Sequence, residues 1–352
     1  MNSKNSKLKV GIAGYGIIGK RRRTFIDSNP HFKTVAVSDI KYKGEGIFPD
    51  GTKFYSDFRL LINQEIDVLF VCLPNYLAAE ATILGLKNRL HVFCEKPPAK
   101  DVDEVLKILK VKKHYPTLKL KYGFNHRYHD SYVEAAKIVK SKKYGNLKNI
   151  RGVYGKSRMV TFEGGWRSHR NYAGGGILLD QGIHMLDMIS TLAGDFDEIH
   201  SFISNDFWKH DVEDNAYVMM RNKSGCVAMI HSTATQWQHR FRLELTLDKA
   251  LIELSGILSG SKSYGEERLK IIPRNIESNN GAFDEISKIF LDDLSWKREI
   301  DEFSDVIINN KKVVNGSPED ALKIMKLIQK IYFSDKKWRD NYHIVLPNNK
   351  QR

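Results

Sequence analysis

Residues 8–19 read LKVGIAGYGIIG, and this stretch decides the fold of the first part of the chain. The apolar run over residues 8–13 predicts a buried strand, and a helical pattern continues through about residue 28. Glycines at 14, 16 and 19, between a strand and a helix, form the G-x-G-x-x-G pattern of a dinucleotide-binding turn. Gly14 permits the tight turn, Gly16 lets a pyrophosphate approach the backbone, and Gly19 lets helix and strand pack closely. The predicted cofactor-binding turn comprises Gly14, Tyr15, Gly16, Ile17, Ile18 and Gly19.

An aspartate follows the next predicted strand, which spans residues 34–38. This residue, Asp39, comes 25 residues after Gly14. A carboxylate there accepts hydrogen bonds from the ribose hydroxyls of adenosine and repels a 2′-phosphate, which favours NAD. Lys41, Lys43 and the run 21–23 (Arg-Arg-Arg) could accommodate that phosphate, so NADP stays an alternative. A turn-forming aspartate is the structural alternative for Asp39.

Strands and helices alternate over the rest of the first third. Strands are predicted at 66–72, 91–94 and 118–122, with helices at 76–88 and 101–114. This alternation is typical of βαβ units, and near-continuous apolar strands indicate a parallel sheet covered on both faces. We therefore predict a doubly wound Rossmann domain over residues 1–123.

The pattern changes after residue 123. A helix is predicted at 131–141, a strand at 147–157, and a helix at 176–192 behind a glycine-rich segment. Strands are predicted at 198–205, 215–221, 226–235, 242–247, 251–254 and 269–273, then helices at 294–309 and 318–334. A run of strands after βα units indicates an α+β domain. We expect residues 124–352 to form it around a large, mostly antiparallel open sheet.

Composition limits the classes of protein. The chain has 352 residues, 41% of them hydrophobic and 28% charged, with a net charge of +14. Its basic residues are dispersed, so we expect no nucleic-acid partner; they form a solvated surface that also favours anionic ligands. No apolar run approaches a bilayer's width, and residues 1–9 lack a signal-peptide core, so we expect a cytoplasmic protein without membrane contact. The three cysteines, Cys72, Cys94 and Cys226, are too scattered for a disulfide framework or a zinc site.

Several motifs resemble the Gfo/Idh/MocA oxidoreductase family. They occur in the family's order and are Pro74-Asn75 after Leu73, Glu95-Lys96-Pro97, Asn125-His126-Arg127, Trp166-Arg167, and the run GGGILLDQGIH at 174–184. Together they are specific, although each alone is weak. One departure is visible, because Ala78 stands where the family often has a histidine after Pro-Asn. That position is peripheral to the chemistry, so the expected activity stands.

The resemblance implies roles for individual residues. Lys96 would contact the nicotinamide ribose and the substrate hydroxyl, Asp180 would bind substrate, and His184 would be the general base. Pro97 would place the loop beside the cofactor. Other cofactor-lining positions implied by it are Leu73, Pro74, Asn75, Glu95, Asn125, Trp166 and Arg167.

The chemistry of alcohol oxidation agrees with those residue types. Hydride departure from carbon requires proton loss from oxygen, and a histidine titrates in the right range to take that proton. A lysine stabilises a developing alkoxide. Asp180 and His184 are four apart, so a helix places both on one face. A buried structural histidine, a solvated lysine, or a metal site that includes Asp187 are the alternatives.

Arg167, His169 and Arg170 precede the glycine run and suit a substrate carboxylate or phosphate. Solvated loop charges explain them equally well. Trp237 and His239 are further candidates for substrate contact.

The leading prediction is an enzyme that transfers a hydride between NAD or NADP and a secondary hydroxyl of a sugar, sugar acid, phosphosugar or nucleotide sugar. Two alternatives are a glycosidase that oxidises its substrate transiently and a non-catalytic dinucleotide-binding regulator. Retention of Lys96, Asp180 and His184 argues against the regulator. By resemblance, the protein would assemble into a homodimer or homotetramer through the sheet of its second domain.

Overall fold

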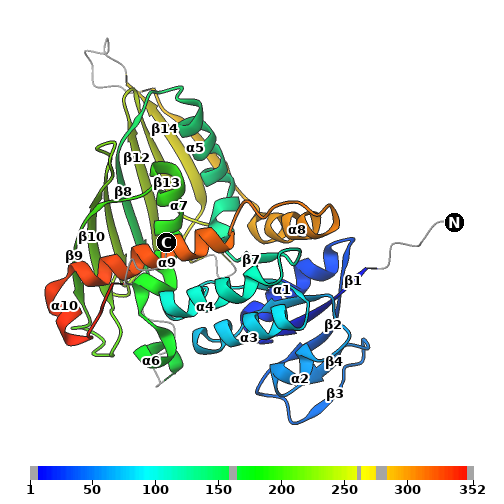
Figure 1. Ribbon diagram of the computed structural model, residues 1–352. Helices are drawn as coiled ribbons and strands as arrows, with labels where there is room; N and C mark the ends of the chain where they lie inside the picture. The colour runs from blue at the N-terminus through cyan, green and yellow to red at the C-terminus, as the bar shows by residue number, and fades with distance from the viewer. Residues whose placement is uncertain (1–6, 158–164, 260–262, 275–283, 347–352) are drawn as a thin grey trace. The chain divides into compact units, whose positions relative to one another are not determined.

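The computed structural model describes residues 7–157, 165–259, 263–274 and 284–346 (Figure 1). The chain forms two compact units. Unit 1 comprises Met1–Asn125, Asn171–Gly174 and Trp296–Lys323, and unit 2 comprises His126–Arg170, Gly175–Ser295 and Ile324–Arg352. Residues 1–6, on which the expectation of no signal peptide partly rests, lie outside the described residues. No helix in the described ranges combines the length and hydrophobicity that crossing a bilayer requires.

A seven-stranded sheet in the order β3-β4-β2-β1-β5-β6-β7 forms the centre of unit 1. All neighbours pair in parallel except β3 and β4 at one edge. The strands are β1 (Leu8–Ala13), β2 (Phe32–Ser38), β3 (Glu45–Ile47), β4 (Lys53–Tyr55), β5 (Val68–Val71), β6 (His91–Cys94) and β7 (Leu120–Tyr122). The helices are α1 (Ile17–Ser28), α2 (Phe58–Ile62), α3 (Asn75–Lys87), α4 (Val102–Lys113) and α8 (Ser295–Ile308). The predicted Rossmann sheet is confirmed.

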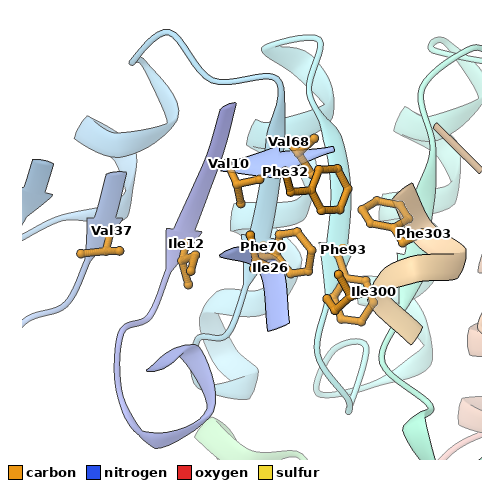
Figure 2. Packing of buried hydrophobic residues seen from close by; sticks show 10 residues of the cluster. All are labelled: Val10, Ile12, Ile26, Phe32, Val37, Val68, Phe70, Phe93, Ile300 and Phe303. Carbon is orange, nitrogen blue, oxygen red and sulfur yellow. The ribbon is translucent and has the colours of Figure 1, made fainter. Parts of the chain in front are cut away.

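Large apolar side chains fill the space between this sheet and its helices. Phe70 and Phe93, on neighbouring strands, stack with ring centroids 4.9 Å apart, and Phe303 of α8 meets both rings edge-on (Figure 2). All three side chains are completely buried. Since α8 lies about 200 residues after β6 in sequence, this packing fixes a C-terminal helix against the N-terminal sheet.

An eight-stranded sheet in the order β15-β14-β13-β12-β8-β11-β10-β9 forms the centre of unit 2. Its strands are β8 (Leu147–Gly155), β9 (Glu198–Ser204), β10 (Asn215–Arg221), β11 (Val227–Thr233), β12 (Arg240–Leu247), β13 (Ala250–Ser255), β14 (Glu267–Pro273) and β15 (Ile286–Phe290). Only β8 and β11 pair in parallel among these neighbours, so the expected mostly antiparallel sheet is confirmed.

Side chains along these strands alternate between buried and exposed, because one face of the sheet is covered. Helices α5 (Asp130–Ser141) and α7 (Ile183–Ala193) pack on β14 and β8 respectively, and on each other (Figure 1). Helix α9 (Pro318–Ser334) passes from unit 1 to unit 2 at residue 324. Helix α10 (Lys336–Asn341) is the last helix in the described residues.

The structure contains elements that the sequence patterns did not indicate. Strands β3 and β4, helix α2 and helix α10 are three to six residues long, too short for a periodic signal. β15 is exposed along most of its length, so it lacks an apolar run. The predicted helix at 176–192 begins as a π-helical turn over Leu178–Gly182 and becomes α-helical at Ile183.

Candidate functional site

Four loops of unit 1 start at the same edge of its sheet. Ala13 is in register with Ser38 of β2 and Val71 of β5, and Val71 with Cys94 of β6. Because these strands are parallel, the segments that follow them emerge side by side. Those segments are the glycine turn at 14–19, Asp39, the loop 72–75 and the Glu95-Lys96-Pro97 loop. Strand order reverses between β1 and β5, the place where open α/β sheets bind ligands.

The glycine turn has no room for a side chain at its first and last glycines. Gly14 has φ +89°, and a Cβ there would lie 2.4 Å from the carbonyl oxygen of Cys72. A Cβ on Gly19 would lie 2.0 Å from the carbonyl oxygen of Gly14, whereas Gly16 faces open space. The turn is therefore closely packed at its two ends and open in the middle, as a pyrophosphate resting on the start of α1 requires.

A cavity of about 210 Å³ opens beside the turn, and the candidate ribose-binding carboxylate Asp39 lines it. Its other lining residues are Tyr15, Gly16, Ile17, Lys20, Lys41 and Tyr42. Oδ1 of Asp39 accepts a hydrogen bond from the backbone N–H of Lys41 at 3.0 Å, which closes the local turn. This cavity combines a carboxylate, an open glycine and an aromatic ring, and these groups fit the adenosine end of a dinucleotide.

The arginines after the glycine turn have partners within unit 1. Arg22 is fully buried, with Nε 2.5 Å from Glu95 and Nη2 2.7 Å from Glu299 of α8. Arg23 donates to Tyr15 Oη at 3.0 Å and to Asp50 at 2.5 Å. These contacts hold both guanidinium groups within the protein, so neither is positioned as a free receptor for a 2′-phosphate.

Burial governs the protonation of this cluster. Burial opposes the charge on Arg22, but Glu95 and Glu299 outweigh it and raise the pKa of Arg22. Burial also raises the pKa of Glu299 to about 7, against the opposing effects of Arg22 and Lys121. The cluster ties the Glu95-Lys96-Pro97 loop, through Arg22, to a helix from the end of the chain.

The remaining predicted residues of unit 1 occupy the same loops. Lys96 is half-buried and precedes Pro97 through a cis peptide bond. Leu73 and Pro74 are half-buried after β5. Asn75, predicted to line the cofactor, donates its amide N–H to the carbonyl oxygen of Ala173 at 2.7 Å. Asn125, which follows β7, is buried and is the last residue of the first segment of unit 1.

Two of the predicted substrate residues of unit 2, Asp180 and His184, lie at the start of the same helix. Asp180 lies in the π-helical turn and His184 in the first turn of α7. Such π-helical turns occur frequently at functional sites. Asp180 Oδ2 is 3.3 Å from Nζ of Lys156, a buried lysine that follows β8.

His184 belongs to a buried group of polar rings. It is 4% exposed, and its ring stacks on His126 with centroids 3.7 Å apart and planes 14° from parallel. Nε2 of His126 is 2.9 Å from Oη of Tyr154, and the Tyr154 ring meets that of Tyr264 edge-on. Burial, together with the nearby carboxylate of Asp180, raises the pKa of both tyrosines, so both hydroxyls stay neutral at physiological pH. The unit thus gathers an imidazole pair, two phenols and a lysine–carboxylate pair.

Other candidates are placed around this group or apart from it. Asp187, considered as a metal ligand, is bound by both Nε and Nη2 of Arg127, at 2.7 and 2.6 Å. The guanidinium of Arg167 lies over the Trp166 ring at 4.3 Å, and His169 is exposed.

Two further candidates lie on the connection between β11 and β12. Nδ1 of His239 lies 3.3 Å from Oγ of Ser157, and its ring meets Tyr264 edge-on. Trp237 is 62% exposed and packs on Phe207.

Sequence reasoning missed the polar groups that surround Asp180 and His184. Lys156 is the last but one residue of the predicted strand at 147–157, and Tyr154 falls at a buried position of that strand. These positions could have been marked as buried polar residues. Tyr264 lies in a loop before β14, where nothing in the sequence connects it to Asp180.

These features define a Rossmann-type dinucleotide-binding protein with a second unit built on a mostly antiparallel sheet. The chain belongs to the Gfo/Idh/MocA family. Residues 8–119 match the model of an oxidoreductase family with an NAD-binding Rossmann fold, and residues 132–253 match the family's C-terminal domain. Family membership thus places the chain among the oxidoreductases that bind a nicotinamide dinucleotide.

Curated relatives include several carbohydrate dehydrogenases. Uncharacterized oxidoreductase YrbE of Bacillus subtilis is 27% identical over 64% of this chain and 67% of its own length. Levoglucosan dehydrogenase of Pseudarthrobacter phenanthrenivorans is 27% identical over 56% of this chain and 54% of its own. Glucose-6-phosphate 3-dehydrogenase of Bacillus subtilis is 31% identical over 51% of this chain and 52% of its own length. The matches thus span about half to two thirds of these relatives.

Solved structures share the fold over almost the whole chain. A levoglucosan dehydrogenase in complex with NADH and levoglucosan has a TM-score of 0.79 at 20% identity, covering 95% of this chain and 98% of that one. The aldose-aldose oxidoreductase of Caulobacter crescentus has a TM-score of 0.78 at 22% identity, covering 94% and 98%. At these identities the likeness concerns the fold.

Proposed function

We propose that this protein transfers a hydride between a secondary hydroxyl of a carbohydrate and NAD or NADP. The supporting observation is the gathering of His184, Asp180 and Lys156 with two neutral tyrosines in unit 2. Unit 1 contributes the strand edge that carries the glycine turn and the Lys96 loop. We assign cofactor binding to residues 1–123, and substrate binding and assembly to 124–352.

In this proposal His184 removes the hydroxyl proton as the carbon is oxidised. A neutral imidazole is suited to this step near pH 7. Lys96 binds the same oxygen and stabilises the negative charge that develops on it. Asp180, oriented by Lys156, accepts a hydrogen bond from a neighbouring substrate hydroxyl. When bound, the nicotinamide supplies the acceptor for the departing hydride.

NAD is the proposed preferred cofactor. Asp39 lines the cavity beside Gly16, where its charge opposes a 2′-phosphate. Arg22 and Arg23, which could have favoured NADP, are held by carboxylates of their own unit. Lys20 and Lys41 line the same cavity and keep NADP as the weaker cofactor.

The proposed substrate class rests on the relatives. The named dehydrogenases act on levoglucosan, glucose 6-phosphate, glucosides and inositol, all of them polyhydroxylated rings. A phosphate or carboxylate on the substrate is part of the proposal, with Arg167 and His169 as its receptors.

Reduced-nicotinamide absorbance tests this function. The panel contains levoglucosan, glucose 6-phosphate, methyl glucoside, inositol, a sugar acid and a nucleotide sugar, each with NAD and then NADP. We expect one class to support turnover. His184→Ala should lower kcat at least about 100-fold, the usual contribution of a proton-transfer group. Lys96→Met should lower kcat by about the same factor, because it removes the charge that stabilises the developing alkoxide. Cofactor should still bind to both variants. Matched controls are Lys107→Met and His114→Ala. Lys107 lies in α4 and His114 directly follows that helix, and both residues are exposed.

Three results would contradict the proposal. Full turnover in both active-site variants would remove the assigned roles. Aglycone release from a glycoside without net reduced cofactor would favour the glycosidase. Cofactor binding with neither activity would favour the regulator.

We also propose that unit 2 forms a homodimer, or a tetramer built from it, through the outer face of β9, β10 and β11. Phe202, Tyr217, Met219 and Met229 are 45% to 78% exposed on that face. Phe202 is in register with Tyr217, and Met219 with Met229, so the apolar side chains form adjacent rows. An exposed apolar surface on a sheet marks an interaction site.

A further inference from the structure

The histidine that stacks on His184 has no role in the reaction as described so far. The His126 ring lies parallel to that of His184 at 3.7 Å, and both side chains are more than nine-tenths buried. His126 is held from the other side by Tyr154, whose hydroxyl lies 2.9 Å from Nε2. Phe241 meets the His126 ring at its edge, 6.3 Å away. Contacts on several sides therefore fix the plane of His126, and through stacking the plane of His184.

We propose that His126 is a positioning residue for the general base, and that its imidazole shares a single proton with that of His184. Its part in catalysis rests on the proposed role of His184, whereas the shared proton is a property of the two stacked rings alone.

Repulsion between like charges gives the physical reason. Two imidazolium ions with ring centres 3.7 Å apart in a buried site disfavour each other, so the pair takes up its second proton only at much lower pH. The two titrations are therefore coupled. After the pair has bound its first proton, His184 is still neutral in roughly half of the molecules when the rings have similar affinities. The base thus stays partly available below the pH at which a lone histidine would be protonated.

The charged groups around the pair come from several elements. On one side His129 meets His126 edge-on at 5.4 Å and holds Glu267 of β14 at 2.7 Å. Burial would raise the pKa of Glu267, but the hydrogen bonds from His129 and Ser131 outweigh it and lower that pKa. The other neighbouring charges are the ion pairs Arg127–Asp187 and Lys156–Asp180, and the nearest neutral titratable groups are Tyr154 and Tyr264. Each of the three carboxylates, Glu267, Asp187 and Asp180, is paired with a basic side chain. The main electrostatic effect of replacing His126 is therefore the loss of its repulsion with His184.

The test replaces His126 with phenylalanine, which keeps a flat stacking ring and cannot bind a proton. Histidine-labelled protein is titrated by NMR, and the His184 signal is assigned by its loss in His184→Gln. In the wild-type protein we expect a broad, two-step titration of His184. In His126→Phe we expect His184 to titrate with a one-proton curve whose midpoint is higher by about one pH unit. The reason is that repulsion weakens binding of the second proton to the wild-type pair roughly hundredfold, and half of this effect appears in the midpoint of each histidine.

Additional variants separate this role from a structural one. His126→Gln also removes the second titration, so it should shift the midpoint in the same direction and serves if the phenylalanine variant does not fold. Tyr154→Phe keeps both histidines and should preserve the two-step curve. His114→Phe, at an exposed position, should leave the His184 titration unchanged. An ordinary one-proton curve with the same midpoint in wild type and His126→Phe would overturn the shared proton.

The catalytic part has a separate readout. With a sugar that is turned over, His126→Phe should move the acid limb of kcat/KM to higher pH with the NMR midpoint. His126→Ala, which also loses the stacked ring, should lower kcat by about tenfold more than His126→Phe, while the KM for cofactor stays the same. Equal kcat in His126→Phe and His126→Ala would overturn the positioning role. If His184→Ala retained turnover, the proposed role of His184 as general base would fail, although the coupled titration could still be observed in the wild-type protein.

Discussion

Replacing Glu299 with glutamine should remove a pH dependence from the stability of unit 1. Glu299 is completely buried, and its pKa is raised to about 7 from an ordinary value of 4.5. For an acid with a raised pKa, the folded state binds more protons than the unfolded state between these two values. Its contribution to stability is therefore complete below pH 4.5 and is lost as the pH rises through 7.

The size of the effect follows from the two pKa values. Each pKa unit corresponds to about 1.4 kcal/mol, so the wild-type protein should lose roughly 3 kcal/mol between pH 4 and pH 8 from this group alone. The glutamine in Glu299→Gln resembles the protonated acid at every pH. The variant should therefore gain that amount relative to the wild type over the same range.

Urea unfolding at pH 4, 5, 6, 7 and 8, followed by circular dichroism, measures the difference. The matched control is Glu319→Gln, an exposed glutamate of α9, which should give no pH-dependent difference. A constant difference between Glu299→Gln and wild type across the range would refute the reasoning. It would mean that Arg22 keeps Glu299 ionised over the whole pH range, because its attraction exceeds the effect of burial.

Other predictions concern the cofactor and the assembly. Asp39→Asn should raise the affinity for NADP relative to NAD by about tenfold or more, because it removes the charge that opposes a 2′-phosphate. Its control is Asp57→Asn, at the half-buried N-cap of α2 in the same unit, where asparagine caps the helix as well as aspartate. Calorimetric titration with each cofactor gives the ratio, and an unchanged ratio would argue against Asp39 as its determinant. Met219→Glu should shift the protein to a smaller species in light scattering, since a buried charge opposes association. The control is Lys107→Glu on α4, and a wild-type mass for Met219→Glu would exclude this face as the interface.

The sequence determined those features that local patterns encode. The glycine turn, the alternation of strands and helices, and the later run of strands each arise from residues close together in the chain, so the Rossmann sheet and the second sheet could be predicted. Gly14 and Asp39 could be selected because each directly follows a predicted strand, and Lys96 because Glu95-Lys96-Pro97 resembles a family motif. One edge of each sheet was not predictable, because β3, β4 and β15 are short or exposed and carry no periodic signal.

Only the tertiary structure decided which distant side chains meet. Arg22 and Glu299 are 277 residues apart, and no spacing in the sequence joins them. The same holds for His126 against His184 and for Tyr264 near Asp180. Local sequence determines the backbone of each element, whereas burial in a shared core selects the partners of a buried charge or ring. The paired imidazoles and the buried arginine cluster are products of that packing, which forms only when the strands and helices are assembled.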